Sequence, residues 1–132
     1  MVFTGFNIMQ IEKMELVYPA YSKHNFYFRQ HISRYVLEQD CVPLNPFMIF
    51  EYFMLDTVDR DLIRNANNNL VRRADQLWVF GEISDGVLAE IKLAKELEKP
   101  IRYFLIVKSR EIREISENEV QFERGLSIED LV

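Results

Sequence analysis

One glutamate stands on the apolar side of a predicted helix. The stretch from Ser84 to Lys99 has the spacing of an amphipathic helix, in which each residue turns by about 100°. Its apolar side chains fall together on one side: Val87, Ile91, Ala94 and Leu97. Glu90 projects into the middle of this apolar arc. If it points into a crevice, its carboxylate can act as a nucleophile or a base. Alternatively it is a solvated residue near a helix N-terminus, where a negative charge is favourable.

The residues that begin this helix are candidates for binding a ligand. Ser84 is a good N-cap residue, and Asp85 and Gly86 follow it directly. Free N–H groups at a helix start can bind a phosphate, a serine adds a hydroxyl donor, and a glycine lets a ligand approach the backbone. The same residues also fit a plain cap and a tight turn.

A second group of candidates ends the first predicted strand. Tyr18 and Tyr21 could each hydrogen-bond a nucleophilic carboxylate or a sugar, and the sequence does not separate them. Ser22 lies in the loop that follows and could join Ser84 in an anion site. For a strand tyrosine, burial in the core is an equally good explanation.

The order of the elements predicts an α/β fold. Strands are expected at 14–20, 76–81 and 101–107, and a short strand followed by a loop at 41–47. Helices are expected at 26–38, 56–73 and 84–97. Strands that alternate with helices indicate a Rossmann-like or flavodoxin-like parallel sheet flanked by helices on both faces. Ligands bind such sheets at the carboxyl ends of the strands, so we expect the loops 20–25, 44–48 and 81–86 to meet there.

Composition narrows the class of protein. The 132 residues are expected to form one domain, with 1–13 as an edge strand or arm and 107–132 as a peripheral tail. A net charge of −5 without a basic patch argues against binding duplex nucleic acid or a membrane surface. We expect a cytoplasmic protein without a metal or cofactor, since Cys41 is the only cysteine and neither histidine has a partner at metal-ligand spacing.

An apolar segment predicts self-association. Residues 47–55 read FMIFEYFML, which is too apolar for a free surface. The segment either packs under the sheet or forms the interface of a homodimer.

Two sequence stretches resemble a known superfamily. YPAYS at 18–22, with its neighbours, and RADQLWVFGEISDGVLAEIKLAKELEKPIRYF at 73–104 are similar to small proteins of the nucleoside 2-deoxyribosyltransferase-like superfamily. The resemblance covers roughly residues 14–106. It implies a deoxyribosyltransferase or a 2'-deoxynucleoside 5'-monophosphate N-hydrolase, with a nucleoside or nucleotide as its small-molecule partner and a dimeric assembly.

The resemblance also selects residues. The hydrolase pattern Y-x-x-x-S selects Tyr18 and Ser22, and its serine and glycine before the nucleophile select Ser84, Gly86 and Glu90. A serine at position 84, where transferases tend to have an aspartate, favours a phosphorylated ligand.

One position departs from the pattern of the relatives. Asn67 stands where they keep a catalytic aspartate, and an amide cannot take up a proton at pH 7. Asp85 or Asp61 could substitute for it. Two hypotheses therefore stay open: an enzyme that cleaves or transfers an N-glycosidic bond through Glu90, and a nucleotide-binding or interaction module of the same fold without turnover.

Overall fold

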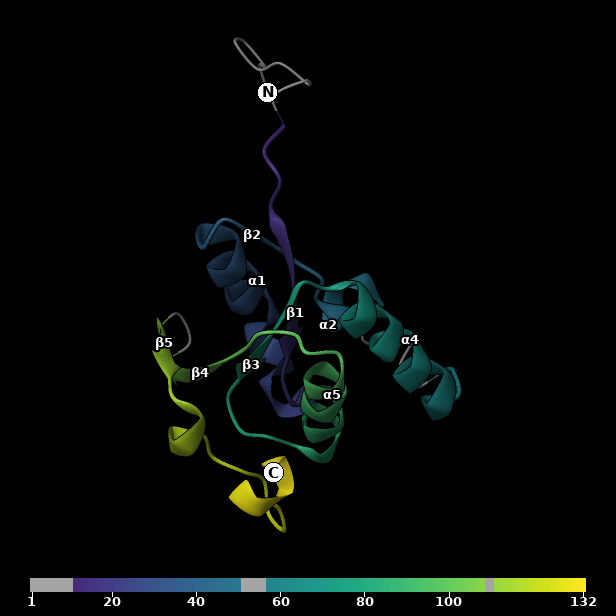
Figure 1. The fold of residues 1–132 in the computed structure, drawn as a ribbon, viewed down its shortest axis with the longest axis vertical. Coiled ribbons are helices and arrows are strands. Elements are labelled where there is room, and N and C mark those ends of the chain that lie inside the picture. Colours follow the sequence, from purple (N-terminus) through teal and green to yellow (C-terminus); the bar gives the residue numbers. More distant parts are fainter. Residues whose placement is uncertain (1–10, 51–56, 109–110) are drawn as a thin grey trace.

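A five-stranded sheet organises the computed structural model, which describes residues 11–50, 57–108 and 111–132 (Figure 1). The strand order is β2-β1-β3-β4-β5. The strands are β1 (Glu15–Ala20), β2 (Cys41–Pro43), β3 (Gln76–Phe80), β4 (Ile101–Lys108) and β5 (Glu111–Ile115). The first four run parallel and β5 is antiparallel to β4. The predicted α/β class is confirmed, and this order places a switch point between β1 and β3, where connections leave in opposite directions.

The helices predicted at 26–38, 56–73 and 84–97 occur with different starts, and short helices also occur outside these ranges. They are η2 (Lys23–Phe28), α1 (Arg29–Glu38), α2 (Pro46–Ile49), α4 (Arg60–Arg73), α5 (Asp85–Glu96), η3 (Glu117–Glu119) and η4 (Ile128–Leu131). The predicted helix 26–38 begins as the 3-10 turn η2. The cap of α4 is Asp59, which accepts a hydrogen bond from the Asp61 amide at 3.0 Å, and not Asp56, which lies outside the described residues.

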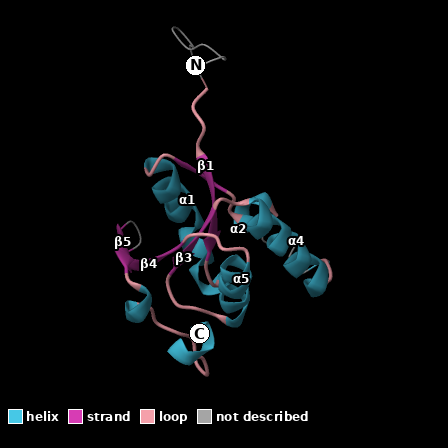
Figure 2. Ribbon diagram, viewed as in Figure 1, coloured by secondary structure: helices cyan, strands magenta, loops and turns pink. Residues whose placement is uncertain are grey.

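Alternating side chains divide the core into two layers, one on each face of the sheet. In β3, Leu77 and Val79 pack under α4 and α5, whereas Trp78 and Phe80 face α1. This is the period of two that a strand buried on both faces requires. Figure 2 shows α1 on one side of the strands and α4 and α5 on the other.

Lys99 holds α4 in place beside α5. Its ammonium group donates to the carbonyl of Arg72 at 2.9 Å and also to that of Ala74. These are carbonyls at the C-terminal end of α4, which the helix itself leaves unpaired. The faces that α4 and α5 turn toward each other are thereby fixed.

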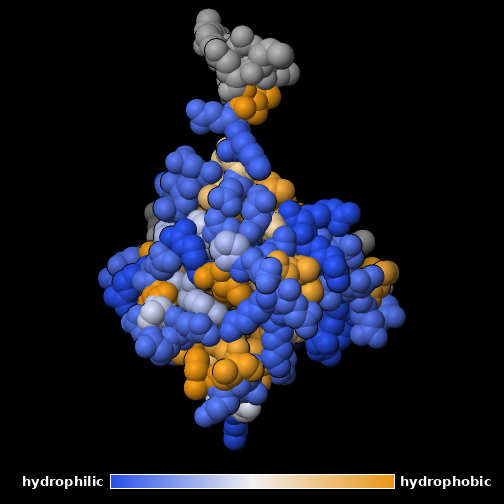
Figure 3. Space-filling view, viewed as in Figure 1, coloured by the Kyte–Doolittle hydropathy of each residue, from blue (hydrophilic) through white to orange (hydrophobic). Residues whose placement is uncertain are grey.

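The C-terminal segment belongs to the packed structure as well as to the surface. Phe122, which follows β5 in the chain, forms a parallel bridge with Ile83. Leu131 is buried beside α5. Lys95 of α5 donates to the Leu131 carbonyl at 2.8 Å. On the face drawn in Figure 3, a hydrophobic area lies over this segment at the bottom of the view.

Two expectations fall largely outside the described residues. The residues that the structure does not describe include 1–10, which make up most of the predicted arm. They also include 51–56, which contain the second half of the apolar segment. In the described half, α2 exposes Met48 and Ile49, each to 49%. The homodimer through this segment stays a prediction.

Candidate functional site

Glu90 in the helix layer is hydrogen-bonded to Tyr18 in the sheet. The Tyr18 phenol in β1 donates a short hydrogen bond to Oε2 of Glu90 in α5. Tyr18 is 1% exposed and Glu90 is half-buried among the apolar side chains beneath α5. The helix period explains this placement, because Glu90 shares its side of α5 with Val87, Ile91 and Ala94.

The surroundings of Glu90 shift its pKa upward. Burial raises the pKa to about 7, although the Tyr18 hydrogen bond and then the Arg64 charge act to lower it. Burial and the nearby Glu90 charge raise the pKa of Tyr18 well above its usual value, so the phenol remains a donor. A carboxylate near its midpoint at neutral pH is able to exchange protons or attack an electrophile.

One face of α4 carries polar groups toward α5. Arg64, Asn67 and Val71 follow the i, i+3, i+7 spacing of a single helix face, and Val71 is fully buried in the layer beneath α5. The side-chain oxygen of Asn67 is buried, and it accepts no hydrogen bond from any described residue. A buried acceptor without a donor costs free energy, so Asn67 is an unsatisfied polar group on this face of α4.

Tyr21, the second tyrosine candidate, lies in a different network. Its hydroxyl donates to Oδ1 of Asn45 at 2.8 Å, and the Asn45 amide donates to Ser33 at 3.0 Å. Asn45 is 2% exposed and also caps α2 by accepting from the Phe47 amide. This network ties the loop after β1 to the loop after β2, which confirms that these two loops meet. It does not include Glu90.

The start of α5 has the geometry of a capped helix. Ser84 Oγ accepts from the Val87 amide at 3.3 Å, and Asp85 is exposed in the first turn. A side chain built onto Gly86 would meet no atom of the protein within 4 Å. The protein's own packing therefore does not require a glycine at position 86.

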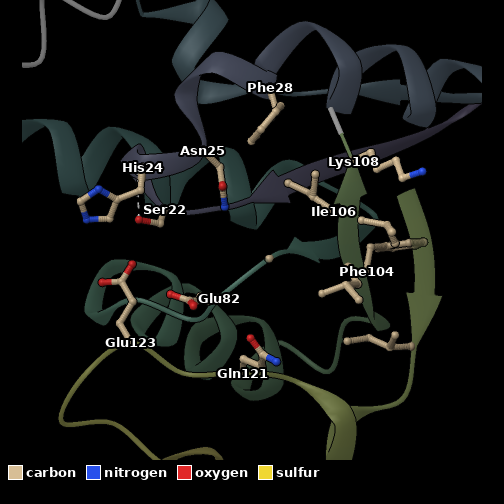
Figure 4. Close-up of a pocket in the computed structure, with 14 residues that line it drawn as sticks. Ser22, His24, Asn25, Phe28, Glu82, Phe104, Ile106, Lys108, Gln121 and Glu123 are labelled. Carbon is tan, nitrogen blue, oxygen red and sulfur yellow. Dashed lines mark hydrogen bonds between the residues drawn. The ribbon is translucent and has the colours of Figure 1, made fainter. Parts of the chain in front are cut away.

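Ser22 lines a pocket that Ser84 and Gly86 do not line. The pocket has a volume of about 390 Å³ and lies at the carboxyl ends of β1, β3 and β4 (Figure 4). Glu82 and Glu123 are among its lining residues. The expected convergence of Ser22, Ser84 and Gly86 is thus not seen in this pocket, and the two carboxylates are unfavourable neighbours for a phosphate at Ser22.

The described residues offer neither a metal centre nor a membrane-spanning helix. No group of three or more His, Cys, Asp or Glu side chains there is arranged to hold a metal ion. No helix within residues 11–50, 57–108 and 111–132 has the length and apolar character needed to cross a membrane.

The positive charge of Arg64 acts to lower the pKa of Glu90, and this residue was not predicted from the sequence. The signal was present: Arg64 precedes Asn67 by three residues and Val71 by seven, so all three had to share a face of any helix over this region. That this face turns toward α5 depends on packing, which the spacing does not contain.

The described residues form an α/β fold in which Tyr18 and Glu90 are hydrogen-bonded to each other. The chain belongs to the family described as Domain of unknown function (DUF7768), which matches residues 16–104. Among solved structures it is similar to a 2-desoxiribosyltransferase from Leishmania mexicana, with a TM-score of 0.54 and 19% identity. That match covers 69% of this chain and 64% of the other, so the chain spans somewhat under two thirds of that protein. At this identity the likeness shows the fold alone. No curated protein matches the chain.

Proposed function

We propose that this protein acts on the N-glycosidic bond of a 2'-deoxynucleoside or its 5'-monophosphate, with Glu90 as the nucleophile. The observation that carries the proposal is the hydrogen bond from Tyr18 to a carboxylate on an otherwise apolar helix face. The similarity to a protein named as a 2-desoxiribosyltransferase supports it at the level of the fold.

The proposed reaction follows the two-step logic of retaining glycosidases. The Glu90 carboxylate attacks the anomeric carbon, the carbon–nitrogen bond breaks, and the base leaves with its electron pair. The sugar is then held as an ester on Glu90. Water attacks the same carbon, releases the free sugar and restores the carboxylate. If a second base attacks in place of water, the same intermediate yields a new nucleoside.

Tyr18 has a positioning role in this scheme. Its phenol occupies one lone pair of the Glu90 carboxylate and restricts the orientation of the other oxygen. Because only ionised Glu90 can attack and its pKa is about 7, turnover should increase as the pH rises through 7. Arg64 supports the ionised form through its positive charge.

The departing base needs a proton or a hydrogen bond. Asn67 shares a helix face with Arg64 and can accept a hydrogen bond through its buried oxygen or donate one through its amide nitrogen, but it cannot deliver a proton. In this proposal the proton comes from solvent, and Asn67 contacts the base or the sugar. Ser84, Asp85 and Gly86 are proposed to contact the 5' end, because Gly86 leaves space beside the backbone.

The second candidate function is nucleotide binding without turnover. It is favoured by one observation, the amide of Asn67 at the position where the resembling enzymes keep an aspartate. In this case the Glu90 carboxyl would recognise a ligand group by hydrogen bonding.

A chromatographic screen for free base decides between the two functions. Wild-type protein is incubated with each common 2'-deoxynucleoside and each 5'-monophosphate, and the released base is quantified. We expect release from at least one substrate, loss by several powers of ten in Glu90→Gln, and a smaller loss in Tyr18→Phe. Glu96→Gln, an exposed glutamate on the same helix, is the matched control.

The outcomes separate cleanly. If the wild-type protein binds a deoxynucleotide but releases no base, and Asn67→Asp releases none either, the enzymatic function is refuted and the binding function remains. Full activity in Glu90→Gln would show that Glu90 is not the nucleophile.

A further inference from the structure

The pocket of about 390 Å³ lies at the carboxyl ends of β1 and β3, beside β4, and the Tyr18–Glu90 pair does not line it. Ile106 of β4 and Phe28, which both pack against the α1 layer of the core, supply apolar side chains to its lining. Phe104 also borders the pocket but is only 1% exposed. Tyr18 belongs to the layer beneath α5, and neither Tyr18 nor Glu90 lines the pocket. The pocket is therefore a separate cavity from the site proposed above.

Strand alternation directs polar side chains into this pocket. Ile83 pairs with the segment at 121–123: its amide donates to the Gln121 carbonyl, and its carbonyl accepts from the Glu123 amide. Ile83 and Phe122 pack into the α5 layer. The residues beside them, Glu82, Gln121 and Glu123, consequently face the other side and line the pocket (Figure 4).

The opposite wall is formed by the turn after β1. Asn25 approaches so closely that a Cβ on Gly81 would lie 2.6 Å from its Nδ2, so the glycine creates the room for the amide. Ser22 is 5% exposed, and its oxygen accepts from the His24 amide at 3.2 Å. The Ser22 O–H donates to no described residue, which leaves a buried donor at the pocket wall.

The carboxylates of this pocket have no cationic partner in the described part of the chain. The ion pairs there involve other residues, and Glu82 and Glu123 occur in none of them. Lys108 lies across the pocket, at its far rim (Figure 4). Two carboxylates beside the apolar side chains of Phe28 and Ile106 form an environment that attracts a cation attached to an apolar group.

We propose that this pocket binds a small organic amine. Its ammonium group lies between Glu82 and Glu123, its flat apolar body lies against Phe28 and Ile106, and a polar oxygen on that body accepts from Ser22. The volume suits one compact molecule of this kind. Because the site is separate from Glu90, amine binding does not depend on the proposed glycosidic chemistry.

Three matched probes test the charge requirement. Tyramine carries an ammonium, tyrosol replaces it with a neutral hydroxyl, and 4-hydroxyphenylacetate replaces it with a carboxylate. Each is titrated into 15N-labelled full-length protein while backbone amide shifts are followed. We expect tyramine to move the amides of Asn25, Gly81, Glu82 and Glu123, and the other two probes to bind at least several-fold more weakly.

Variants test the assignment to these residues. Glu82→Gln and Glu123→Gln should each weaken tyramine binding by about two- to fivefold, as partly exposed charge pairs do. Glu96→Gln and Glu90→Gln should leave the dissociation constant unchanged. Equal affinity for tyramine and tyrosol, an unchanged dissociation constant in the Glu82→Gln/Glu123→Gln double variant, or no shift at these amides would each overturn the proposal.

Discussion

The replacement Glu90→Gln should stabilise the protein at high pH and not at low pH. The half-buried carboxyl has its pKa raised from 4.5 to about 7, chiefly by burial. The folded state therefore binds a proton more tightly than the unfolded state does. A group of this kind stabilises the fold below pH 4.5, and this contribution is lost as the pH rises through 7.

The size of the effect follows from the pKa change. Each tenfold change in proton affinity is worth about 1.4 kcal/mol, so a rise from 4.5 to about 7 corresponds to roughly 3 kcal/mol. Because Glu90 retains some solvent contact, we expect about 2–3 kcal/mol. Glutamine keeps the shape and still accepts from Tyr18, but it has no charge to bury.

Urea unfolding at pH 5, 6, 7 and 8 measures this difference directly. The free energy of unfolding of Glu90→Gln minus that of wild type should grow with pH and level off above about pH 8. Glu96→Gln, on the exposed side of α5, should show no such trend. A difference that stays flat across the pH range, or a Glu90→Gln protein less stable than wild type at pH 8, would refute the reasoning. The latter would mean that attraction to Arg64 outweighs burial.

Three further substitutions have defined outcomes. Asn67→Asp should raise base release if the enzyme proposal holds, because it restores a carboxyl where the resembling enzymes have one; the chromatographic screen measures it, and a fall would contradict the role. Gly81→Ala should lower the free energy of unfolding by about 1–3 kcal/mol, since φ is +81° and the new Cβ would meet Asn25 at 2.6 Å; chemical denaturation checks this. Ser84→Ala should cost about 1 kcal/mol through loss of the cap on the Val87 amide, and an unchanged midpoint would show that the cap is redundant.

Local patterns were sufficient to predict most of the fold. The apolar runs at β1, β3 and β4 and the amphipathic spacing of α5 depend on neighbours within a few residues, so they can be recognised in one dimension. The start of α4 at Arg60 was missed because both Asp56 and Asp59 satisfy the chemistry of an N-cap. The antiparallel direction of β5 was not predicted, because a local pattern indicates a strand and not the direction in which it pairs.

The choice between Tyr18 and Tyr21 could have been narrowed from the sequence. The two residues are three positions apart, and an odd spacing places strand side chains on opposite faces. Only one of them could therefore reach α5. Which face α5 covers is decided by the handedness and packing of the connection, so the pairing of Tyr18 with Glu90 required the structure.

The amine pocket lay beyond sequence reasoning for a different reason. Glu82 and Glu123 are far apart in the chain, and they meet only because Ile83 pairs with the segment around Phe122. No local sequence pattern predicts a bridge of this kind. Taken alone, Glu82 and Glu123 each have the pattern of a solvent-exposed charged residue. The same bridge that buries Ile83 also turns the two carboxylates to one side.

Stability does not explain why a carboxylate is present at position 90. An apolar residue there would continue the side of α5 formed by Val87, Ile91 and Ala94 and would carry no burial penalty. Instead the protein holds a group whose charge costs about 2–3 kcal/mol at neutral pH, and it supplies Tyr18 and Arg64 to favour that charge. A structural ion pair would have shown Glu90 bound directly to a cation, whereas its partner is a neutral phenol. A destabilising carboxylate with a positioned donor is typical of a group kept for chemistry or ligand recognition, and this is the physical ground for the proposal that Glu90 is a functional residue.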